Sequence, residues 1–506
     1  MVENLWMGFE ITFQWANVLA IVIGVLVGIA VGAMPGMNAA TGIAVLLPFT
    51  YALPSETSLI LLCALYTACE YGGSITAIAI STPGTPSAVA TVFDGYQLTL
   101  KGLPCKALGI SLYSSVAAGF FTTFALILLA VPLASVALRF GPPEYFALGI
   151  FGMAVVSSLT GKSWIKGFIA AVAGLMITIV GIDPFTSFPR FSFGIVELFE
   201  GIGLIPAIIG LLAAAEVFVM LEELSPAGAV IRKISGALPT WQEFKTTVGA
   251  TVRGSIIGLI IGIIPGAGGA IASMIAYNEE RRWSKEPSKF GTGCLEGVAA
   301  PEAANNAVVS GALVPMLTLG VPGSAAVAVL MGALTLHNLV PGPELFSKHP
   351  GVVYSLFASL FVSNLVVLVV GLMGTRLWLQ VIKTPKSILA PMNLMVAAVG
   401  CYAVNNSLFQ VWIMLIFGLI GYLMRKFDFP IVPMVLAMVL GFMIETNLRR
   451  ALLIGEGSWL IFLTRPLSLI FLILGAISFF YPFWQARAEK KGAVPKVPTG
   501  TTSLEE

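Results

Sequence analysis

The segment "GVLVGIAVGAMPG" (residues 24–36) places three glycines at four-residue intervals before a Pro-Gly pair, and the chain repeats this pattern as "GSIIGLIIGIIPG" (residues 254–266). The two copies lie 230 residues apart and agree at five positions. A second pair of segments, "ISTPGTPSAVA" (80–90) and "LGVPGSAAVAV" (319–329), matches at an offset of 239 residues. Self-similarity at a fixed spacing is the mark of an internal repeat. The pattern therefore predicts two homologous halves.

The repeat divides the chain into segments that we define by residue number. The first half is residues 1–230 and the second is residues 231–459. An apolar stretch at 460–486 predicts one additional transmembrane helix, and we expect residues 487–506 to form a disordered cytoplasmic tail. The second copy of the repeat is longer by nine residues, and the excess falls in the charged loop "NEERRWSKEPSKF" (278–290).

Composition predicts a membrane protein. Hydrophobic residues make up 57% of the 506-residue chain and charged residues 10%, whereas soluble domains carry about 25% charged residues. Apolar runs of about 20 residues, long enough for a helix to cross a ~30 Å hydrocarbon layer, recur along the chain. Lipid allows only helices or closed barrels to span it, and these runs do not alternate as strands do. The predicted fold class is an all-α polytopic membrane protein in the lipid bilayer, and nothing indicates nucleic-acid binding.

The positions of Lys and Arg predict how the halves are inserted, because basic residues concentrate on the cytoplasmic side. We place the N-terminus outside and the C-terminus in the cytoplasm, with about eleven crossings and two helical hairpins. The first half then has an odd number of crossings, so the second half enters from the opposite side. Inverted repeats, each here with a hairpin and a discontinuous crossing helix, are typical of secondary transporters. Of the 27 basic residues, 21 lie inside in this scheme and six lie outside: Arg139, Arg190, Lys348, Arg449, Arg450 and Arg465.

The repeated glycines and the Pro-Gly pair predict different features of the structure. Small residues every fourth position let membrane helices pack closely, which is a structural role. Residues 13–52 as one unbroken helix would measure roughly 60 Å, so the Pro-Gly pair predicts a hairpin. Its second helix would begin near Asn38 in the first half and Gly268 in the second, and helix N-termini bind anions; a turn among the lipid headgroups is the alternative. The predicted substrate-binding residues are Pro35, Gly36, Asn38, Thr41, Pro265, Gly266, Gly268, Gly269, Asn305 and Asn306.

Each half also contains a second predicted break, at 69–88 in the first half and at 301–324 in the second. Irregular backbone at membrane depth is tolerated only where protein or a water-filled cavity surrounds it, so two such breaks predict a central polar site. Hydroxyl and carbonyl oxygens are suitable ligands for Na⁺. The predicted ion-binding residues are Gly72, Gly73, Ser74, Thr76, Thr82, Thr85, Thr318 and Ser324.

Isolated acidic residues have structural and functional interpretations. Glu302 follows Pro301, so it is interpreted either as part of a helix start or as an ion-coupling group. Asp94 begins "DGYQLTLKG", which we interpret as a cytoplasmic turn, and Glu216 is expected to face a partner helix. No spacing resembles a nucleophile with its base, a set of metal ligands or a phosphate-binding loop. We therefore expect no enzyme activity, no cofactor and no metal other than a coupling Na⁺.

The sequence resembles the large membrane subunit of the tripartite tricarboxylate transporters, the TctA family, over nearly its whole length. The matching motifs are "GAMPGMNAATGIAVLLPFT", "YGGSITAIAISTPGTPSAVATVFDGY", "IPGAGGAIASMIAYNEE", "FGTGCLEGVAAPEAANNAVVSGALVPMLTLGVPGS" and "PGPELF". One departure is "ACEYGG", in which Glu70 stands where the family pattern has a small or amide-type residue.

The resemblance implies a multi-pass carrier of the bacterial inner membrane, in which the N-terminus that the basic residues place outside would be periplasmic. It would work with a small membrane subunit and a periplasmic solute-binding protein that delivers a citrate-like carboxylate, and a Na⁺ gradient would drive the transport. The alternative function class is a channel, or a membrane scaffold subunit without ion-coupled transport. A channel would need neither a binding protein nor an ion gradient.

Overall fold

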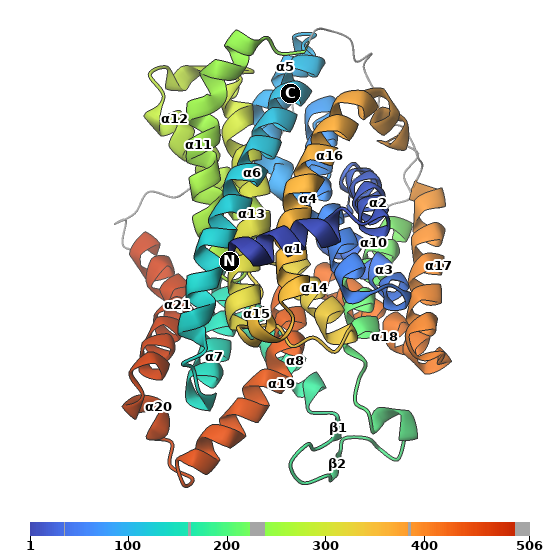
Figure 1. Ribbon diagram of the computed structural model, residues 1–506, viewed down its shortest axis with the longest axis vertical. Coiled ribbons are helices and arrows are strands. Elements are labelled where there is room, and N and C mark those ends of the chain that lie inside the picture. Colours follow the sequence, from blue (N-terminus) through green and yellow to red (C-terminus); the bar gives the residue numbers. More distant parts are fainter. Residues whose placement is uncertain (35, 160–162, 223–237, 383–385, 491–506) are drawn as a thin grey trace.

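The computed structural model describes residues 1–34, 36–159, 163–222, 238–382 and 386–490 and is mostly helical (Figure 1). The first half contains α1 (Val2–Thr12), α2 (Trp15–Gly32), α3 (Ala39–Leu46), α4 (Ser55–Ile80), α5 (Val89–Leu100), α6 (Pro104–Ala137), α7 (Pro142–Leu159), α8 (Trp164–Thr178), α9 (Leu204–Ile209) and α10 (Ala215–Glu222). The second half contains α11 (Trp241–Ile263), α12 (Gly268–Trp283), α13 (Glu296–Leu319), α14 (Ala325–Leu336), α15 (Glu344–Lys348), α16 (Pro350–Ile382), α17 (Lys386–Asn405), α18 (Leu408–Lys426) and α19 (Ile431–Ile454). The chain continues with α20 (Ile461–Thr464) and α21 (Pro466–Lys490).

Short irregular elements complete the chain path. A 3-10 helix, η1 (Leu47–Ala52), continues α3, and η2 (Pro86–Ala88) leads into α5. A π-helical turn, η4 (Gly210–Ala214), joins α9 to α10. Two further 3-10 turns are η3 (Val196–Leu198) and η5 (Pro287–Lys289), and the antiparallel strands are β1 (Gly181–Ile182) and β2 (Pro189–Arg190). The strands include Arg190, one of the six basic residues predicted to lie outside.

The predicted all-α polytopic class is confirmed. Eight helices of the described residues are long and apolar enough to cross a membrane, and five further apolar helices are shorter. Eleven crossings therefore stays a prediction. The C-terminal apolar segment forms α21, which packs against α7, and that this helix crosses the membrane stays a prediction. It extends to Lys490, and the remainder of the predicted tail lies outside the described residues.

The glycine pattern of the first half forms the contact between α2 and α4. Gly24 lies against Leu61, and Gly32 lies against Cys69. Residue numbers rise together along the two helices, so α2 and α4 run parallel. The segment from α3 to η1 must therefore bring the chain back to the side from which α2 started, which is the predicted hairpin.

The second half repeats this packing between α11 and α13. Gly254 lies against Ala300, and Gly262 lies against Gly311. These helices also run parallel, and α12 returns the chain between them. A Cβ atom at Gly254 would overlap the backbone carbonyl of Ala300, so the close approach requires a residue without a side chain.

The two central helices, α4 and α13, come from different halves and run antiparallel. Glu70 contacts Asn305, and Ser74 contacts Glu302, so rising numbers on α4 meet falling numbers on α13. Nearly every residue of both helices is buried. This antiparallel relation is what oppositely inserted repeats require, although the boundary near residue 230 lies outside the described residues.

The helices form two groups that meet around α3 and α14. One group consists of α2, α4, α5, α6, α11, α12, α13 and α16, and we call it the core bundle. The other consists of α7, α8, α9, α10, α17, α18, α19 and α21, and we call it the outer bundle. The short helices α3 and α14 pack against each other, against α4 of the core bundle, and against η4 and α19 of the outer bundle.

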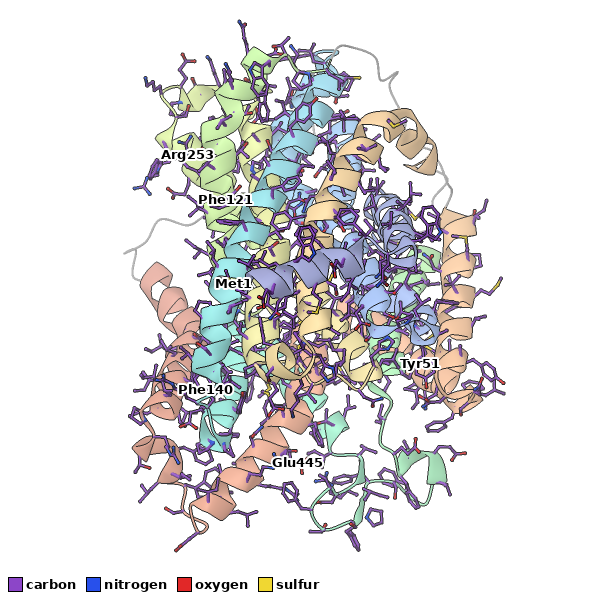
Figure 2. All side chains as sticks on the ribbon, in the orientation of Figure 1. Met1, Tyr51, Phe121, Phe140, Arg253 and Glu445 are labelled. Carbon is purple, nitrogen blue, oxygen red and sulfur yellow. The ribbon has the colours of Figure 1, made fainter. Side chains whose placement is uncertain are left out.

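Several ion pairs lie toward the two ends of the molecule. Figure 2 labels Arg253 and Glu445 toward opposite ends of its long axis. Arg253 pairs with Glu280 at 2.5 Å, and Glu445 pairs with Arg190 at 2.6 Å. Charged groups at both ends and an apolar middle are the distribution expected of a membrane-spanning bundle.

Candidate functional site: a cavity between the two halves

The hairpin tips have the backbone geometry that the Pro-Gly pairs predict. Gly36 has φ +90° and Gly266 has φ +76°, values that favour glycine. The helix after the first tip, α3, begins behind Asn38, whose Oδ1 atom accepts a hydrogen bond from the backbone N–H of Thr41 at 3.0 Å. The helix after the second tip, α12, begins at Gly268.

The two crossings end in equivalent ways. α4 ends at Ser81 with φ +58°, and α13 ends at Gly320 with φ +70°; both residues have the left-handed conformation that stops a helix. The chain then folds back along the hairpin of its own half. A Cβ atom at Gly84 would collide with the carbonyl of Gly32, and one at Gly323 would approach the carbonyl of Gly262 to 2.5 Å. Each break thus lies beside the end of the first hairpin helix.

Tips and breaks from both halves surround one cavity of about 520 Å³. Five helical segments begin at its wall, namely α3, α12, α14, α19 and the segment from η2 to α5. Each N-terminus has backbone N–H groups without an intrahelical partner, of which Asn38 and Ser324 cap one each, and the positive end of a helix dipole. Ser324 caps α14 by accepting the backbone N–H of Val327 at 3.3 Å, and its hydroxyl contacts the Tyr66 hydroxyl at 3.1 Å. The cavity is therefore suited to an anion.

A polar cluster lies on one wall of the cavity. The Glu70 carboxylate accepts a short hydrogen bond from Ser87, and the Ser87 and Thr85 hydroxyls lie 3.0 Å apart. Asn305 donates from Nδ2 to the backbone oxygen of Glu70 at 3.2 Å. Its Oδ1 atom is buried without a hydrogen-bond partner among the described residues, 3.0 Å from where a Cβ atom of Gly269 would stand.

The cavity lining also includes a positively charged side chain that the sequence did not identify as part of the site. Arg425, in the last turn of α18, lines the cavity and forms an ion pair with Glu216 of α10. Among the described lining residues it is the one basic side chain, and Glu70 is the one acidic side chain. Glu216 also reaches the first hairpin tip, because a Cβ atom at Gly36 would stand 2.6 Å from its Oε1 atom. The expectation that Glu216 faces a partner helix is confirmed.

The predicted substrate-binding residues fall into three groups. Four line the cavity: Asn38, Gly266, Gly268 and Gly269. Asn305 lies just behind them, and Gly36, Thr41 and Pro265 belong to the same tips without lining the cavity. Asn306 points elsewhere, because its Nδ2 atom donates to the Glu302 backbone oxygen of its own helix at 3.3 Å. Pro35 lies outside the described residues.

The predicted ion-binding residues are more scattered. Thr85 and Ser324 line the cavity. Gly72 and Gly73 are sites of close packing, against Ile29 and Thr85 respectively. The hydroxyls of Thr76, Thr82 and Thr318 bond to nearby carbonyls: Gly73 at 3.2 Å, Ile80 at 3.4 Å and Val314 at 2.6 Å. Ser74 donates to Glu302 at 2.5 Å.

Glu302 is the centre of a separate buried cluster. Its carboxylate accepts hydrogen bonds from Ser74, from Ser111 at 2.8 Å, from Ser115 at 3.3 Å and, at short range, from Thr91. The side chain is fully buried. The helix-start interpretation is wrong, because α13 begins at Glu296 and continues through Pro301.

Asp94 was also misassigned, since it lies within α5 and is fully buried. Its carboxylate accepts hydrogen bonds from the Tyr277 hydroxyl at 2.9 Å and from three backbone N–H groups in the loop before α13, those of Gly291, Gly293 and Cys294. Asp94 therefore ties the first half to the second and is not part of an exposed turn.

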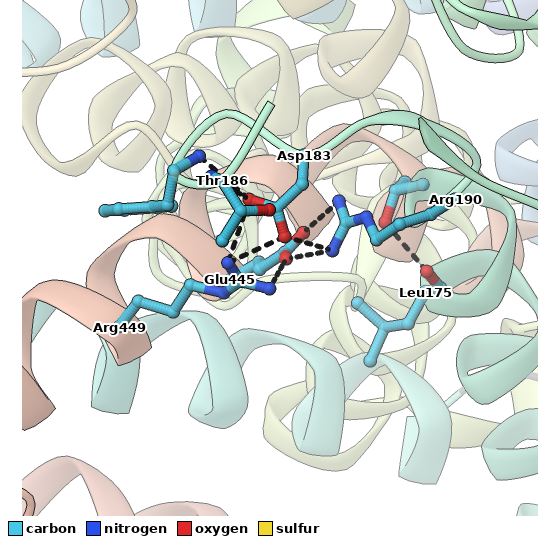
Figure 3. A network of polar contacts seen from close by, with 8 residues as sticks. Leu175, Asp183, Thr186, Arg190, Glu445 and Arg449 are labelled. Carbon is cyan, nitrogen blue, oxygen red and sulfur yellow. Dashed lines mark hydrogen bonds and ion pairs between the residues drawn. The ribbon is translucent and has the colours of Figure 1, made fainter. Parts of the chain in front are cut away.

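A charged network beside β1 and β2 anchors the segment between α8 and α9 (Figure 3). Asp183 pairs with Arg449 at 2.8 Å and with Arg190 at 3.5 Å, and both arginines also pair with Glu445. The backbone N–H of Phe185, with further hydrogen bonds from Thr186 and Arg449, lowers the pKa of Asp183 to about 2. The carboxylate is therefore charged at neutral pH and fixes the segment to α19.

An all-α membrane bundle whose internally repeated hairpins and broken helices enclose a cavity with a few polar and charged side chains defines a membrane transport protein. The family model of the Tripartite tricarboxylate transporter TctA family matches residues 18–436. The chain belongs to this family, whose members are the large membrane subunits of tripartite tricarboxylate transporters.

Two proteins of Agrobacterium vitis are similar to this chain. An uncharacterized 52.8 kDa protein in the TAR-I ttuC' 3' region is 38% identical over 475 residues, which cover 94% of this chain and 95% of that protein. An uncharacterized protein in the TAR-II ttuC' 3' region is 36% identical over 214 residues, covering 42% of this chain and 88% of that protein. A crystal structure of the Eremococcus coleocola manganese transporter aligns over 94% of this chain and 96% of that one, at 15% identity and a TM-score of 0.13. That likeness carries no argument about the fold or the function.

Proposed function

We propose that the protein is the permease of a secondary active transporter that imports citrate-like carboxylates, with substrate bound in the cavity between the two halves. The observation that carries this proposal is the convergence of five helix N-termini and Arg425 on one cavity. Helix N-termini and an arginine are the groups that proteins use to hold carboxylates.

A cation site beside the substrate would couple the two fluxes, and we expect Na⁺ there. Glu70, Ser87 and Thr85 bring carboxylate and hydroxyl oxygens together, and the buried Oδ1 atom of Asn305 lacks a partner among the described residues. A carboxylate near the middle of a membrane protein is costly unless a positive charge or a proton accompanies it. A cation bound at Glu70 would also reduce its repulsion of an anionic substrate.

The two bundles support a moving-carrier mechanism over a channel. The core bundle supplies the helix starts of α12 and of the η2–α5 segment, whereas Leu212, Arg425 and residues 429–432 of the outer bundle close the other wall. Sliding of one bundle against the other would carry the cavity from one side to the other. A fixed pore would require no such division of the walls.

The family supplies the proposed partners and location. We expect a bacterial inner-membrane protein with a periplasmic N-terminus and a cytoplasmic C-terminus, which works with a small membrane subunit and a periplasmic solute-binding protein. The binding protein would bring the carboxylate to the outer face. The partners and the location rest on membership of the TctA family, and the orientation rests on the distribution of Lys and Arg.

The test is uptake of labelled citrate into proteoliposomes that contain the complete transporter. We expect uptake that requires both an inward Na⁺ gradient and the solute-binding protein. Citrate uptake that requires neither the Na⁺ gradient nor the solute-binding protein would support a channel and contradict the proposal. A screen of the binding protein against other carboxylates then identifies the preferred substrate.

Two Gly→Ala variants provide a matched pair for the cavity. At Gly269 a Cβ atom would stand 2.8 Å from the Ser87 Cβ atom, in the wall of the cavity, whereas at Gly332 the nearest atom would be 3.7 Å away, on Leu47. We expect Gly269→Ala to reduce citrate uptake severalfold while Gly332→Ala retains it. Equal uptake by both variants would show that the tip of the second hairpin does not border the transported substrate.

A further inference from the structure

The last turn of α18 makes two ion pairs with α10, and only one of them reaches the cavity. Lys426 pairs with Glu222 at 3.0 Å, and about half of each side chain is exposed. Arg425 pairs with Glu216, whose side chain is only 6% exposed, while 32% of the Arg425 side chain is accessible. Arg425 lines the cavity, and neither Lys426 nor Glu222 does so. The two pairs connect the same helices but differ in what they face.

We propose that Arg425 binds a carboxylate group of the transported anion, and that Glu216 holds the guanidinium in place of that anion while the cavity is empty. This inference rests on the proposed carboxylate transport and names the residue that recognises the substrate charge. Guanidinium binds a carboxylate through two parallel hydrogen bonds, and the carboxylate of Glu216 and that of the substrate are chemically equivalent partners.

The surroundings favour an exchange over a permanent structural pair. Arg425 is the one basic side chain among the described lining residues, so an anion that enters the cavity has no other full positive charge to bind. Glu216 is nearly buried and is fixed next to the first hairpin tip, whereas Arg425 is long, flexible and partly exposed. The arginine is therefore the partner that can turn toward a substrate.

Exchange also provides a release step. Arg425 and Glu216 both belong to the outer bundle, whereas the N-terminus of α12 belongs to the core bundle. A substrate held at once by Arg425 and by the N-terminus of α12 would connect the two bundles and oppose their movement. Because Glu216 competes for the guanidinium, the substrate can be released from Arg425 without leaving that charge unpaired.

The structural pair and the exchange predict opposite changes in anion affinity for the Glu216→Gln variant. If the pair is only structural, removing either charge weakens the fold and lowers anion affinity. If Glu216 competes with substrate, Glu216→Gln removes the competitor and nearby like charge, so anion binding becomes tighter. Glutamine keeps the size of the side chain and an oxygen that can accept from Arg425, so the variant tests charge and not packing.

The experiment measures equilibrium binding by the purified full-length protein in lipid nanodiscs, where both faces are accessible. Citrate, isocitrate, malate and succinate serve as probes, and the anion that binds wild type most tightly is used for the variants. We expect Glu216→Gln to bind this anion about tenfold more tightly, and Arg425→Gln to bind it at least about tenfold more weakly, because a charge-assisted hydrogen bond is lost. Arg425→Lys should fall between wild type and Arg425→Gln, since it keeps the charge without the planar fork.

Lys426→Gln and Glu222→Gln are the matched controls, because they break the neighbouring pair between the same helices, and both should bind like wild type. Weaker binding by both Glu216→Gln and Arg425→Gln, or wild-type binding by Arg425→Gln, would overturn the inference while leaving the proposed function intact. Absence of binding by wild type to all four acids would instead overturn the proposed function, and this inference with it. Elution volume and melting temperature identify any variant that has not folded, in which case Arg425→Lys decides the role of the arginine.

Discussion

Replacing Glu302 with alanine should destabilise the protein, because the carboxylate is the shared acceptor for hydroxyls on three helices. Ser74 lies on α4, Thr91 on α5, and Ser111 and Ser115 on α6, and all four donate to Glu302 of α13. Each of these side chains is nearly or fully buried. Water cannot replace the lost acceptor without entering the bundle.

The expected loss of stability depends on whether the four hydroxyls find other hydrogen-bond acceptors. A buried donor without a partner costs about 1–3 kcal/mol. Serine and threonine on a helix recover part of this by bonding to the carbonyl of the preceding turn, so we expect a net loss of roughly 3–5 kcal/mol. Unfolding entropy of about 2.1 cal/mol/K per residue gives about 1 kcal/mol per degree for a chain of 506 residues. The melting temperature of Glu302→Ala should therefore fall by roughly 3–5 °C.

The assay is thermal unfolding of purified protein in detergent, followed by intrinsic fluorescence. Glu302→Gln should lie between wild type and Glu302→Ala, because its amide keeps the size of the side chain and one acceptor oxygen. Glu197→Ala removes an exposed carboxylate and should leave the melting temperature unchanged. If Glu302→Ala melts at the wild-type temperature, the four-hydroxyl cluster does not stabilise this bundle and the reasoning is refuted.

Three further predictions concern packing, pH and transport. Gly28→Ala should lower the melting temperature, because its Cβ atom would overlap the Leu65 carbonyl on α4, whereas Leu26→Ala on the exposed face of α2 should have little effect; equal shifts would contradict the packing. Since the pKa of Asp183 is lowered to about 2, its contribution to stability should be complete above about pH 4 and lost as the pH falls toward 2. Wild type should then lose more stability over this interval than Asp183→Asn, and parallel curves would contradict the network. Asn305→Ala should reduce coupled uptake, while Asn306→Ala, whose amide bonds within its own helix, should retain it; the reverse order would exclude Asn305 from the site.

The hairpins and the breaks could be predicted because they follow from local chemistry. A Pro-Gly pair between two apolar stretches favours a turn, and Gly36 and Gly266 have the positive φ that such turns require. The second breaks occur where predicted, but they are shorter than expected. Residues 69–80 and 301–319 are helical, and the irregular backbone is confined to the segments that follow Ser81 and Gly320.

The residues that the sequence analysis misjudged depend on contacts between distant segments. Arg425 lies near the end of an apolar helix, where a basic residue is ordinarily a cytoplasmic anchor, and only the packing of α18 against α10 brings it to the cavity. Asp94 is followed by a glycine in a polar stretch that suggests a turn, yet its partners lie about 200 residues later in the chain. Glu302 was interpreted as part of a helix start because it follows Pro301. Proline is tolerated inside transmembrane helices, so Pro301 does not mark the start of a helix here.

Glu70 shows what a departure from a family pattern can contribute. The sequence marks it as unusual, and the structure places its carboxylate on the cavity wall, where Ser87 donates to it. A second acid, Glu302, was equally visible in the sequence but lies in a separate buried cluster. Side-chain type alone does not distinguish the two positions, because both acids lie on the two central helices.

The measurement that tests the central claim most directly is a cryo-electron microscopy map of the protein in nanodiscs with saturating citrate. The account predicts citrate density within the cavity, with carboxylates at the N-termini of α12 and α14 and at Arg425. Citrate density at another location, with this cavity empty, would contradict it.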